Sequence, residues 1–156
     1  ENIAFGLRLK NFSEQKIQQT VNRYLEITDL VKFKNVYPSN LSGGMQQRVA
    51  IARTLANDPK ILLMDEPFGS LDMQTRSKMQ EFLATLWEQN HKTIVFVTHD
   101  IEEAIFLADK VILLTQRPAK IKKEYSIDFG RPRLHDLKFS EKFFNLKKTI
   151  LKDLES

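Results

Sequence analysis

The spacing of apolar positions along the chain predicts strands and helices in alternation. Three short and nearly continuous apolar runs, at residues 61–64, 93–97 and 110–114, are typical of strands in a parallel sheet that is covered on both faces. Apolar residues at helical spacing predict helices between these runs, at residues 79–86 and 101–108. The order strand, helix, strand, helix, strand indicates an α/β fold with right-handed crossovers.

Two further helices are predicted before the first strand. Ser13 and Glu14 begin a helix, and Ser42 caps a second one that Asn57-Asp58-Pro59 ends. Between them, residues 31–40 are predicted to be a loop because Pro38 disfavours a helix across them. The apolar side of the first helix comprises Ile17, Val21, Leu25 and Leu30, and that of the second comprises Met45, Val49, Ala52 and Ala56.

The last part of the chain is predicted to add a strand near Ile121–Ile127, a turn at Gly130–Pro132 and a closing amphipathic helix. That helix starts at Ser140, and its apolar side comprises Phe143, Ile150 and Leu154.

Composition narrows the class of protein. The 156 residues correspond to about one domain, and no apolar run approaches the roughly 20 residues of a membrane-spanning helix. The absence of cysteine excludes disulfides and thiolate metal sites. The chain starts at Glu1, without Met, inside what reads as structured sequence, and we interpret it as a piece of a longer protein.

The net charge of +4 is concentrated in the carboxyl-terminal part. Residues 116–156 carry 11 Lys and Arg against 6 Asp and Glu, whereas residues 1–115 carry 13 against 14. A basic tail can meet acidic lipids or nucleic acid. Acidic residues interrupt these lysines and no aromatic pattern accompanies them, which favours an ordinary solvated helix face.

Two adjacent acids, Asp65 and Glu66, directly follow the strand at 61–64. Successive side chains on a strand point to opposite faces, so the two carboxylates can take different roles. One carboxylate can hold Mg²⁺ through its water shell while the other faces a nucleophilic water. Ligands of open α/β sheets bind beyond the carboxyl ends of strands, where this pair lies. For an isolated pair of acids, the start of a turn is the commoner interpretation.

Ser42, Gly43 and Gly44 form a candidate anion site at a helix start. A helix start presents unpaired backbone N–H groups and a positive dipole end, and paired glycines let a phosphate approach the backbone. A serine cap after a flexible turn is the equally good structural alternative.

His99 and Asp72 are further candidates. His99 follows the strand at 93–97, which puts its imidazole at the same sheet edge as Glu66. Asp100 and Glu103 are expected to form a capping box for the next helix. A lone histidine is more often a satisfied surface or core group, and Asp72 is also a natural cap for the helix through residue 79.

Four stretches carry a family resemblance. In chain order they are LSGGMQQR (41–48), ILLMDEP (61–67), SLD (70–72) and THD (98–100). They are similar to the signature, the Walker B motif with its catalytic glutamate, the D-loop and the histidine switch. With them the chain resembles the ATP-binding subunit of ABC transporters, as far as about residue 130. Met45 departs from the family, which commonly has glutamine there; such a glutamine could reach back to the Ser42 cap, and methionine cannot.

The resemblance implies an α/β fold that forms the carboxyl-terminal part of a P-loop NTPase domain, with a parallel-sheet core preceded by a helical subdomain. The expected division is a helical subdomain with the signature at 1–58, a RecA-like core at 59–117, and a strand and amphipathic helix at 118–156. RPAKIKKEYSIDFGRPR and SEKFFNLKKTILKDL also resemble the tail of the nitrate, sulfonate and taurine importer group.

The resemblance further implies that two ATPase subunits sandwich ATP head to tail. Ser42, Gly43 and Gly44 are then expected to contact the γ-phosphate of ATP held by the opposite subunit. Asp72 is expected to help join the two sites across the dimer.

Catalysis, by the same resemblance, uses residues at the strand ends. Asp65 is expected to support Mg²⁺, Glu66 to polarise the attacking water and His99 to touch the γ-phosphate. Phosphoryl transfer depends mainly on positioning and charge neutralisation.

The implied partners are a second ATPase subunit, integral membrane permease subunits and a solute-binding protein, with no nucleic acid. The implied place is the cytoplasmic face of a bacterial membrane. No glycine is followed by lysine, so the phosphate-binding loop is missing, and we expect the 156-residue chain by itself to be inactive. We also expect uncovered apolar surface on residues 61–64 or 93–97. The alternatives are a non-transport ABC-type ATPase and an inactive interaction module.

Overall fold

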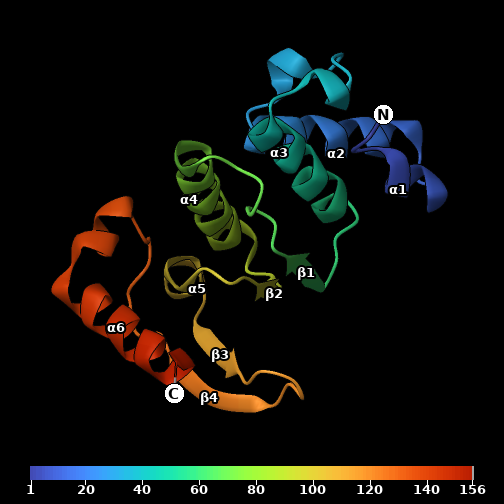
Figure 1. Ribbon diagram of the computed structural model, residues 1–156. Helices are drawn as coiled ribbons and strands as arrows, with labels where there is room; N and C mark the ends of the chain where they lie inside the picture. The colour runs from blue at the N-terminus through green and yellow to red at the C-terminus, as the bar shows by residue number, and fades with distance from the viewer. Residues whose placement is uncertain (156) are drawn as a thin grey trace. The chain divides into compact units, whose positions relative to one another are not determined.

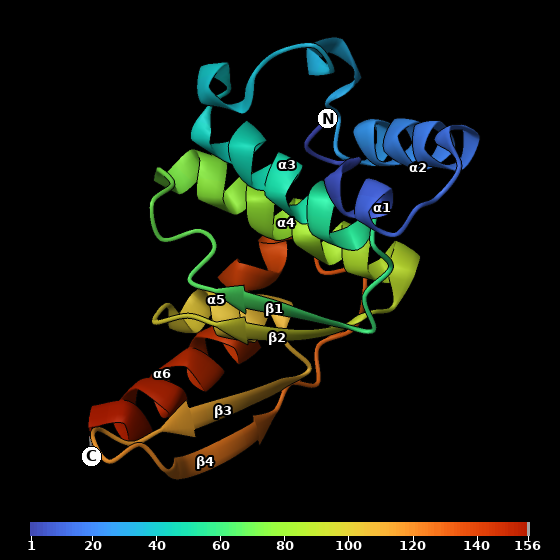
Figure 2. The same cartoon turned by 90° about the vertical axis from the view of Figure 1, so that its right-hand side faces the viewer.

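The computed structural model describes residues 1–155, apart from the side chain of Asn90, and divides them into two compact units. The first unit comprises Glu1–Thr75 and Lys92–Val95. The second comprises Arg76–His91 and the described chain from Phe96 onward. Figure 1 and Figure 2 show both units. No helix of the described residues is long and apolar enough to cross a membrane. The expected division at residues 58 and 117 stays a prediction.

Helices and strands follow one another in a mixed order. The α-helices are α1 (Phe5–Leu9), α2 (Glu14–Ile27), α3 (Gly43–Leu55), α4 (Met73–Asn90), α5 (Ile101–Leu107) and α6 (Glu141–Glu155). The strands are β1 (Ile61–Asp65), β2 (Thr93–Val97), β3 (Lys110–Leu114) and β4 (Ile121–Ser126). Three short 3₁₀ helices are η1 (Val31–Phe33), η2 (Pro38–Asn40) and η3 (His135–Phe139). Every predicted strand and helix is present, and α4 extends well beyond the predicted residues 79–86 at both ends.

The helices of the first unit begin where the sequence predicts. Ser13 accepts a hydrogen bond from the Lys16 N–H and caps α2, which confirms that helix start. Helix α3 lies beside α1, and the Tyr24 hydroxyl of α2 donates to the Leu55 carbonyl of α3 at 3.0 Å. Helix α1 was not predicted, because its five residues are too few to show a helical period.

The segment at 31–40 is not the plain loop that the sequence indicates. It contains η1 and η2, and Pro38 is the first residue of η2. Proline's fixed φ suits the first turn of a helix, so it excludes a helix through itself but not one that begins there.

Strands β1 and β2, which α4 connects, are hydrogen-bonded neighbours, and β2 lies partly in each unit. The prediction that these strands are covered on both faces is wrong for the described residues. Leu62 and Met64 are 4% and 8% exposed, whereas Ile61 and Leu63 are 56% and 74% exposed. Packing partners therefore cover one face of β1, and the expectation of uncovered apolar surface is confirmed.

In the second unit, β3 does not continue a parallel sheet with β1 and β2. It pairs antiparallel with β4, with Lys110 opposite Ser126 and Val111 opposite Tyr125. The short connection at 115–120 is the reason, because antiparallel neighbours need only a tight turn whereas parallel neighbours need a long crossover.

Helix α6 packs against α5, and Phe106, Phe143 and Ile150 are at most 1% exposed. The prediction that Leu154 is buried is wrong, since its side chain is 47% exposed. Leu154 lies only about 40° around the helix from the buried Ile150, but it is in the last turn of α6, and the neighbouring Asp153 accepts hydrogen bonds from Lys123 and Tyr125 of β4.

Candidate functional site

The acidic pair lies at the carboxyl end of β1, as the sequence predicts. Asp65 is the last residue of that strand, and both acids are exposed. Glu66 has a φ of 42°, in the left-handed region that residues other than glycine seldom adopt. Phe68, which is 0% exposed, anchors the turn that follows, and the Gly69 N–H donates to the Glu66 carbonyl at 3.1 Å. Backbone strain of about 1–3 kcal/mol at such a position is typical of functional sites.

The start of α3 is capped as predicted. The Ser42 hydroxyl accepts a hydrogen bond from the Met45 N–H at 3.4 Å. The Met45 side chain cannot hydrogen-bond to the backbone before the helix, but that of the next residue does. Gln46 Nε2 donates to the Leu41 carbonyl at 3.0 Å. This contact is to the carbonyl of the residue before the cap, so it differs from the contact to Ser42 that a glutamine at position 45 could make.

The two glycines of this helix start have different surroundings. Gly43 is exposed, and a Cβ there would lie 3.2 Å from Leu71 Cδ2. Gly44 is buried, and a Cβ there would lie only 2.5 Å from Thr75 Cγ2. Packing alone therefore explains Gly44, whereas Gly43 leaves its backbone open to a ligand. The helix start thus packs on the segment that follows the acidic pair.

Replacing Gly44 by alanine is expected to destabilise the protein by about 1–3 kcal/mol, because the added methyl group overpacks against Thr75. Urea denaturation of the complete gene product measures the change in unfolding free energy. Gly130→Ala is the matched control, since nothing lies within 4 Å of a Cβ built there. Equal midpoints for the two variants would contradict the packing argument.

Asp72 caps α4. Its Oδ1 accepts hydrogen bonds from the backbone N–H groups of Gln74 and Thr75 at 3.1 and 3.0 Å. A side-chain hydrogen bond from Thr75, with these backbone bonds, holds the pKa of Asp72 below its ordinary value. The stabilisation by this cap is therefore present above the unfolded-state pKa and is lost as pH falls through the lowered folded-state pKa. The capping interpretation is confirmed, and the role between subunits stays a prediction.

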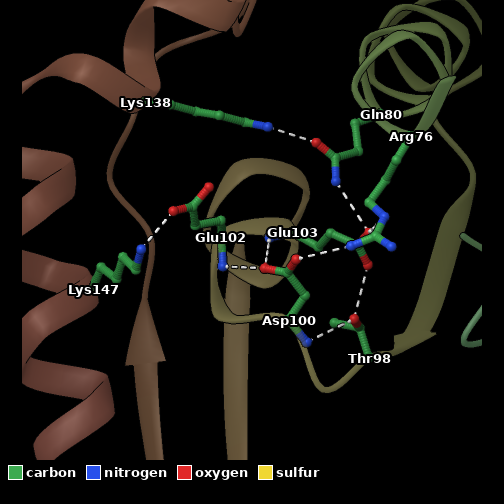
Figure 3. A network of polar contacts seen from close by, with 8 residues as sticks. All are labelled: Arg76, Gln80, Thr98, Asp100, Glu102, Glu103, Lys138 and Lys147. Carbon is green, nitrogen blue, oxygen red and sulfur yellow. Dashed lines mark hydrogen bonds and ion pairs between the residues drawn. The ribbon is translucent and has the colours of Figure 1, made fainter. Parts of the chain in front are cut away.

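His99 belongs to the second unit, where it is exposed between β2 and α5. Asp100 caps α5 by accepting the N–H groups of Glu102 and Glu103 at 2.8 and 3.2 Å. The predicted capping box is wrong in its second half. The Asp100 N–H donates to the Thr98 hydroxyl, and the Glu103 carboxylate binds that hydroxyl as well (Figure 3).

Sequence reasoning missed the buried polar residues around this turn. Glu103 and Gln80 are each 3% exposed, and Gln80 Nε2 donates to Glu103 Oε1 at 3.1 Å. No signal in the sequence indicated this burial, because at about 100° per residue Glu103 lies on the side of the helix opposite to the predicted apolar stripe.

The exposed acidic pair, Asp65 and Glu66, supplies the candidate ligands for a metal ion. Among the described residues, no group of three or more His, Asp or Glu side chains is placed to hold a metal ion. The exposed Asp65 nevertheless fits Mg²⁺, which keeps several waters and is often held by one or two carboxylates plus substrate phosphates.

Residues 2–69 match the protein family described as ABC transporter. A nitrate import ATP-binding protein of Synechocystis sp. is 43% identical over 156 residues, which are 96% of this chain and 59% of that protein. An aliphatic sulfonates import ATP-binding protein of Bacillus cereus is 45% identical over 155 residues, 99% of this chain and 59% of that protein. A taurine import ATP-binding protein of Jannaschia sp. is 43% identical over 155 residues, 97% of this chain and 58% of that protein.

Two solved structures of ABC transporter proteins are also similar to this chain. The cbiO1 protein of Clostridium perfringens, part of the ABC transporter complex cbiONQ, matches with a TM-score of 0.73 and 26% identity over 95% of this chain and 55% of that one. A dimeric bacterial ABC transporter cassette matches with a TM-score of 0.66 and 37% identity over 83% of this chain and 56% of that one. The chain spans about 60% of the length of the curated relatives it matches.

Proposed function

The chain belongs to the ATP-binding domains of ABC transporters, and from this premise we propose that it is part of an importer subunit that couples ATP hydrolysis to solute uptake. The transported solute is proposed to be small and of the nitrate, sulfonate or taurine type, after the relatives' names.

One observation carries the proposal. Within the first unit, the segment that starts with the strained Glu66 runs on to Leu71 and Thr75, against which the Ser42-Gly43-Gly44 helix start packs. A carboxylate suited to activating water therefore begins the segment on which a helix start suited to binding an anion packs. This arrangement supports a role for both groups in the chemistry of a triphosphate.

For the hydrolytic step, Glu66 is proposed to orient and polarise the attacking water, and His99 to donate a hydrogen bond to the γ-phosphate. Asp65 is proposed to hold Mg²⁺ through water molecules; when bound, that ion neutralises charge on the phosphate oxygens. The exposure of all three side chains supports these roles.

Two copies of the subunit are proposed to share each ATP. The N–H groups at the start of α3, with the Ser42 hydroxyl, bind the γ-phosphate of ATP held by the opposite copy, and the exposed Gly43 admits the phosphate closely. Asp72 is proposed to help connect the two sites at the start of α4.

The remaining partners follow from the same proposal. Integral permease subunits carry the solute, a solute-binding protein delivers it, and the ATPase works at the cytoplasmic face of the membrane. Two similar structures support the permease and the second subunit, because cbiO1 is part of a transporter complex and the other cassette is dimeric.

Hydrolysis by the purified complete gene product tests the proposal. We expect Mg²⁺-dependent release of phosphate from ATP, and a shift from monomer to dimer when ATP is added to the Glu66→Gln variant. Chelation of Mg²⁺ is expected to stop hydrolysis. A product that neither releases phosphate nor dimerises with ATP would contradict the proposal.

A further inference from the structure

The turn that carries His99 is held by the side chain before it. The Thr98 hydroxyl donates to Glu103 Oε2 at 2.8 Å and accepts the Asp100 N–H at 3.0 Å (Figure 3). Thr98 thus joins the residues on both sides of His99 to α5. Two hydrogen bonds at one hydroxyl leave this turn little freedom to rotate.

Glu103, the acceptor, is itself fixed from α4. Its side chain is 4% exposed, and a buried carboxylate requires compensation. Gln80 Nε2 donates to Glu103 Oε1 at 3.1 Å, and Arg76 Nε lies 4.0 Å from the same oxygen. Arg76 Nη1 also lies 3.7 Å from Asp100 Oδ2, so one guanidinium faces both acids of the turn (Figure 3).

A second layer of charge supports this arrangement. Lys138 donates to Gln80 Oε1 at 2.6 Å and thereby fixes which end of the amide faces Glu103 (Figure 3). Lys147 of α6 donates at 2.5 Å to Oε1 of Glu102, the residue of α5 that precedes Glu103. The buried carboxylate therefore lies at the centre of a network that draws on α4, α5, α6 and the 3₁₀ helix η3.

From this geometry we propose that Thr98, Glu103 and Gln80 are positioning residues, which fix the direction of His99 for hydrolysis and couple it to α4. The inference rests on the proposed function of His99. Asp72 caps α4, and Arg76 and Gln80 lie one and two turns further along that helix. Gln80 and Arg76 therefore link α4 to Glu103 and Asp100 by side-chain contacts.

The test measures ATP hydrolysis by the complete gene product with Thr98→Val, in the native background and with His99→Ala. Valine keeps the shape of threonine and removes the hydroxyl. We expect Thr98→Val to lower kcat about tenfold at unchanged KM for ATP, because the histidine is misdirected. Thr98→Ser keeps the hydroxyl and is expected to restore most of the rate. In the His99→Ala background, Thr98→Val is expected to change the rate less than about twofold.

The matched control is Thr149→Val, which removes the hydroxyl that donates to the Asn145 carbonyl at an exposed position of α6. This variant is expected to leave kcat unchanged. Gln80→Leu supplies a second variant if Thr98→Val does not fold, with the same expected loss and the same dependence on His99. A loss that is equal in both backgrounds would show a merely structural role and overturn the inference, while the proposed function stands. If His99→Ala itself leaves hydrolysis unchanged, the role of His99 and this inference both fail.

Discussion

Replacing Glu66 by glutamine is expected to slow ATP hydrolysis by the complete gene product at least about 100-fold, because an amide cannot accept a proton from the attacking water. ATP binding is expected to persist or tighten, since the variant removes a negative charge beside the triphosphate. Phosphate release measures the first effect, and equilibrium binding of a fluorescent ATP analogue measures the second.

Glu26→Gln is the matched control, because Glu26 is an exposed acid of α2 in the same unit. It is expected to hydrolyse ATP at the native rate. A Glu66→Gln variant that retains more than about a tenth of the native rate would remove Glu66 from the role of base.

Replacing Arg133 by leucine is expected to lower the free energy of unfolding by about 3 kcal/mol. The Arg133 side chain is 1% exposed, and its Nη1 donates to the carbonyls of Ile105, Phe106 and Ala108 at 3.3, 3.0 and 2.7 Å. These carbonyls end α5 and have no helical partner of their own, so the guanidinium serves as the cap. Leucine fills the space but leaves the buried carbonyls of Ile105 and Phe106 and the half-buried carbonyl of Ala108 without this donor.

Urea denaturation of the complete gene product checks this expectation. Arg117→Leu is the matched control, because it removes the same charge from an exposed position. Burial lowers the pKa of Arg133 from its ordinary value, and its hydrogen bonds to carbonyls come from Nη1 and Nη2. Equal unfolding midpoints for the Arg133 and Arg117 variants would contradict the assigned capping role.

The helix starts could be predicted from the sequence because they depend on neighbours in the chain. Ser13, Ser42, Asp72 and Asp100 each accept a backbone N–H two or three residues ahead, and this spacing is visible in the sequence. The three apolar runs were predictable as strands for the same reason.

The features that failed prediction depend on residues far apart in the chain. The requirement for glycine at Gly44 comes from Thr75, and the cap of α5 comes from Arg133, more than 20 residues after that helix. The pairing of β3 with β4 also depends on the length of a connection rather than on the pattern within either strand. The sequence left a phosphate site and a serine cap after a flexible turn as equally good interpretations of the glycine pair, and neither indicated the packing against Thr75 that explains Gly44.

The partial cover of β1 shows a limit of a different kind. A continuous apolar run indicates that both faces of a strand can be buried, but the described residues cover only the face of Leu62 and Met64. An apolar run shows only that burial of both faces of a strand is favourable. The elements that pack against the strand decide which face is buried.

The central claim is that the helix start at Ser42 and the acid at Glu66 act on one ATP from different copies of the protein. Mixing two inactive variants, Glu66→Gln and Gly43→Glu, tests it most directly. A glutamate at position 43 suits a helix start but repels a triphosphate. In a mixed dimer, one of the two sites then combines an intact Glu66 with an intact Gly43.

If the sites are shared, an equal mixture of the two variants regains about a quarter of the native rate of hydrolysis, since half of the dimers are mixed and each has one intact site. If each copy builds its site alone, every site in the mixture is damaged. A mixture that forms mixed dimers and yet stays inactive would contradict the account.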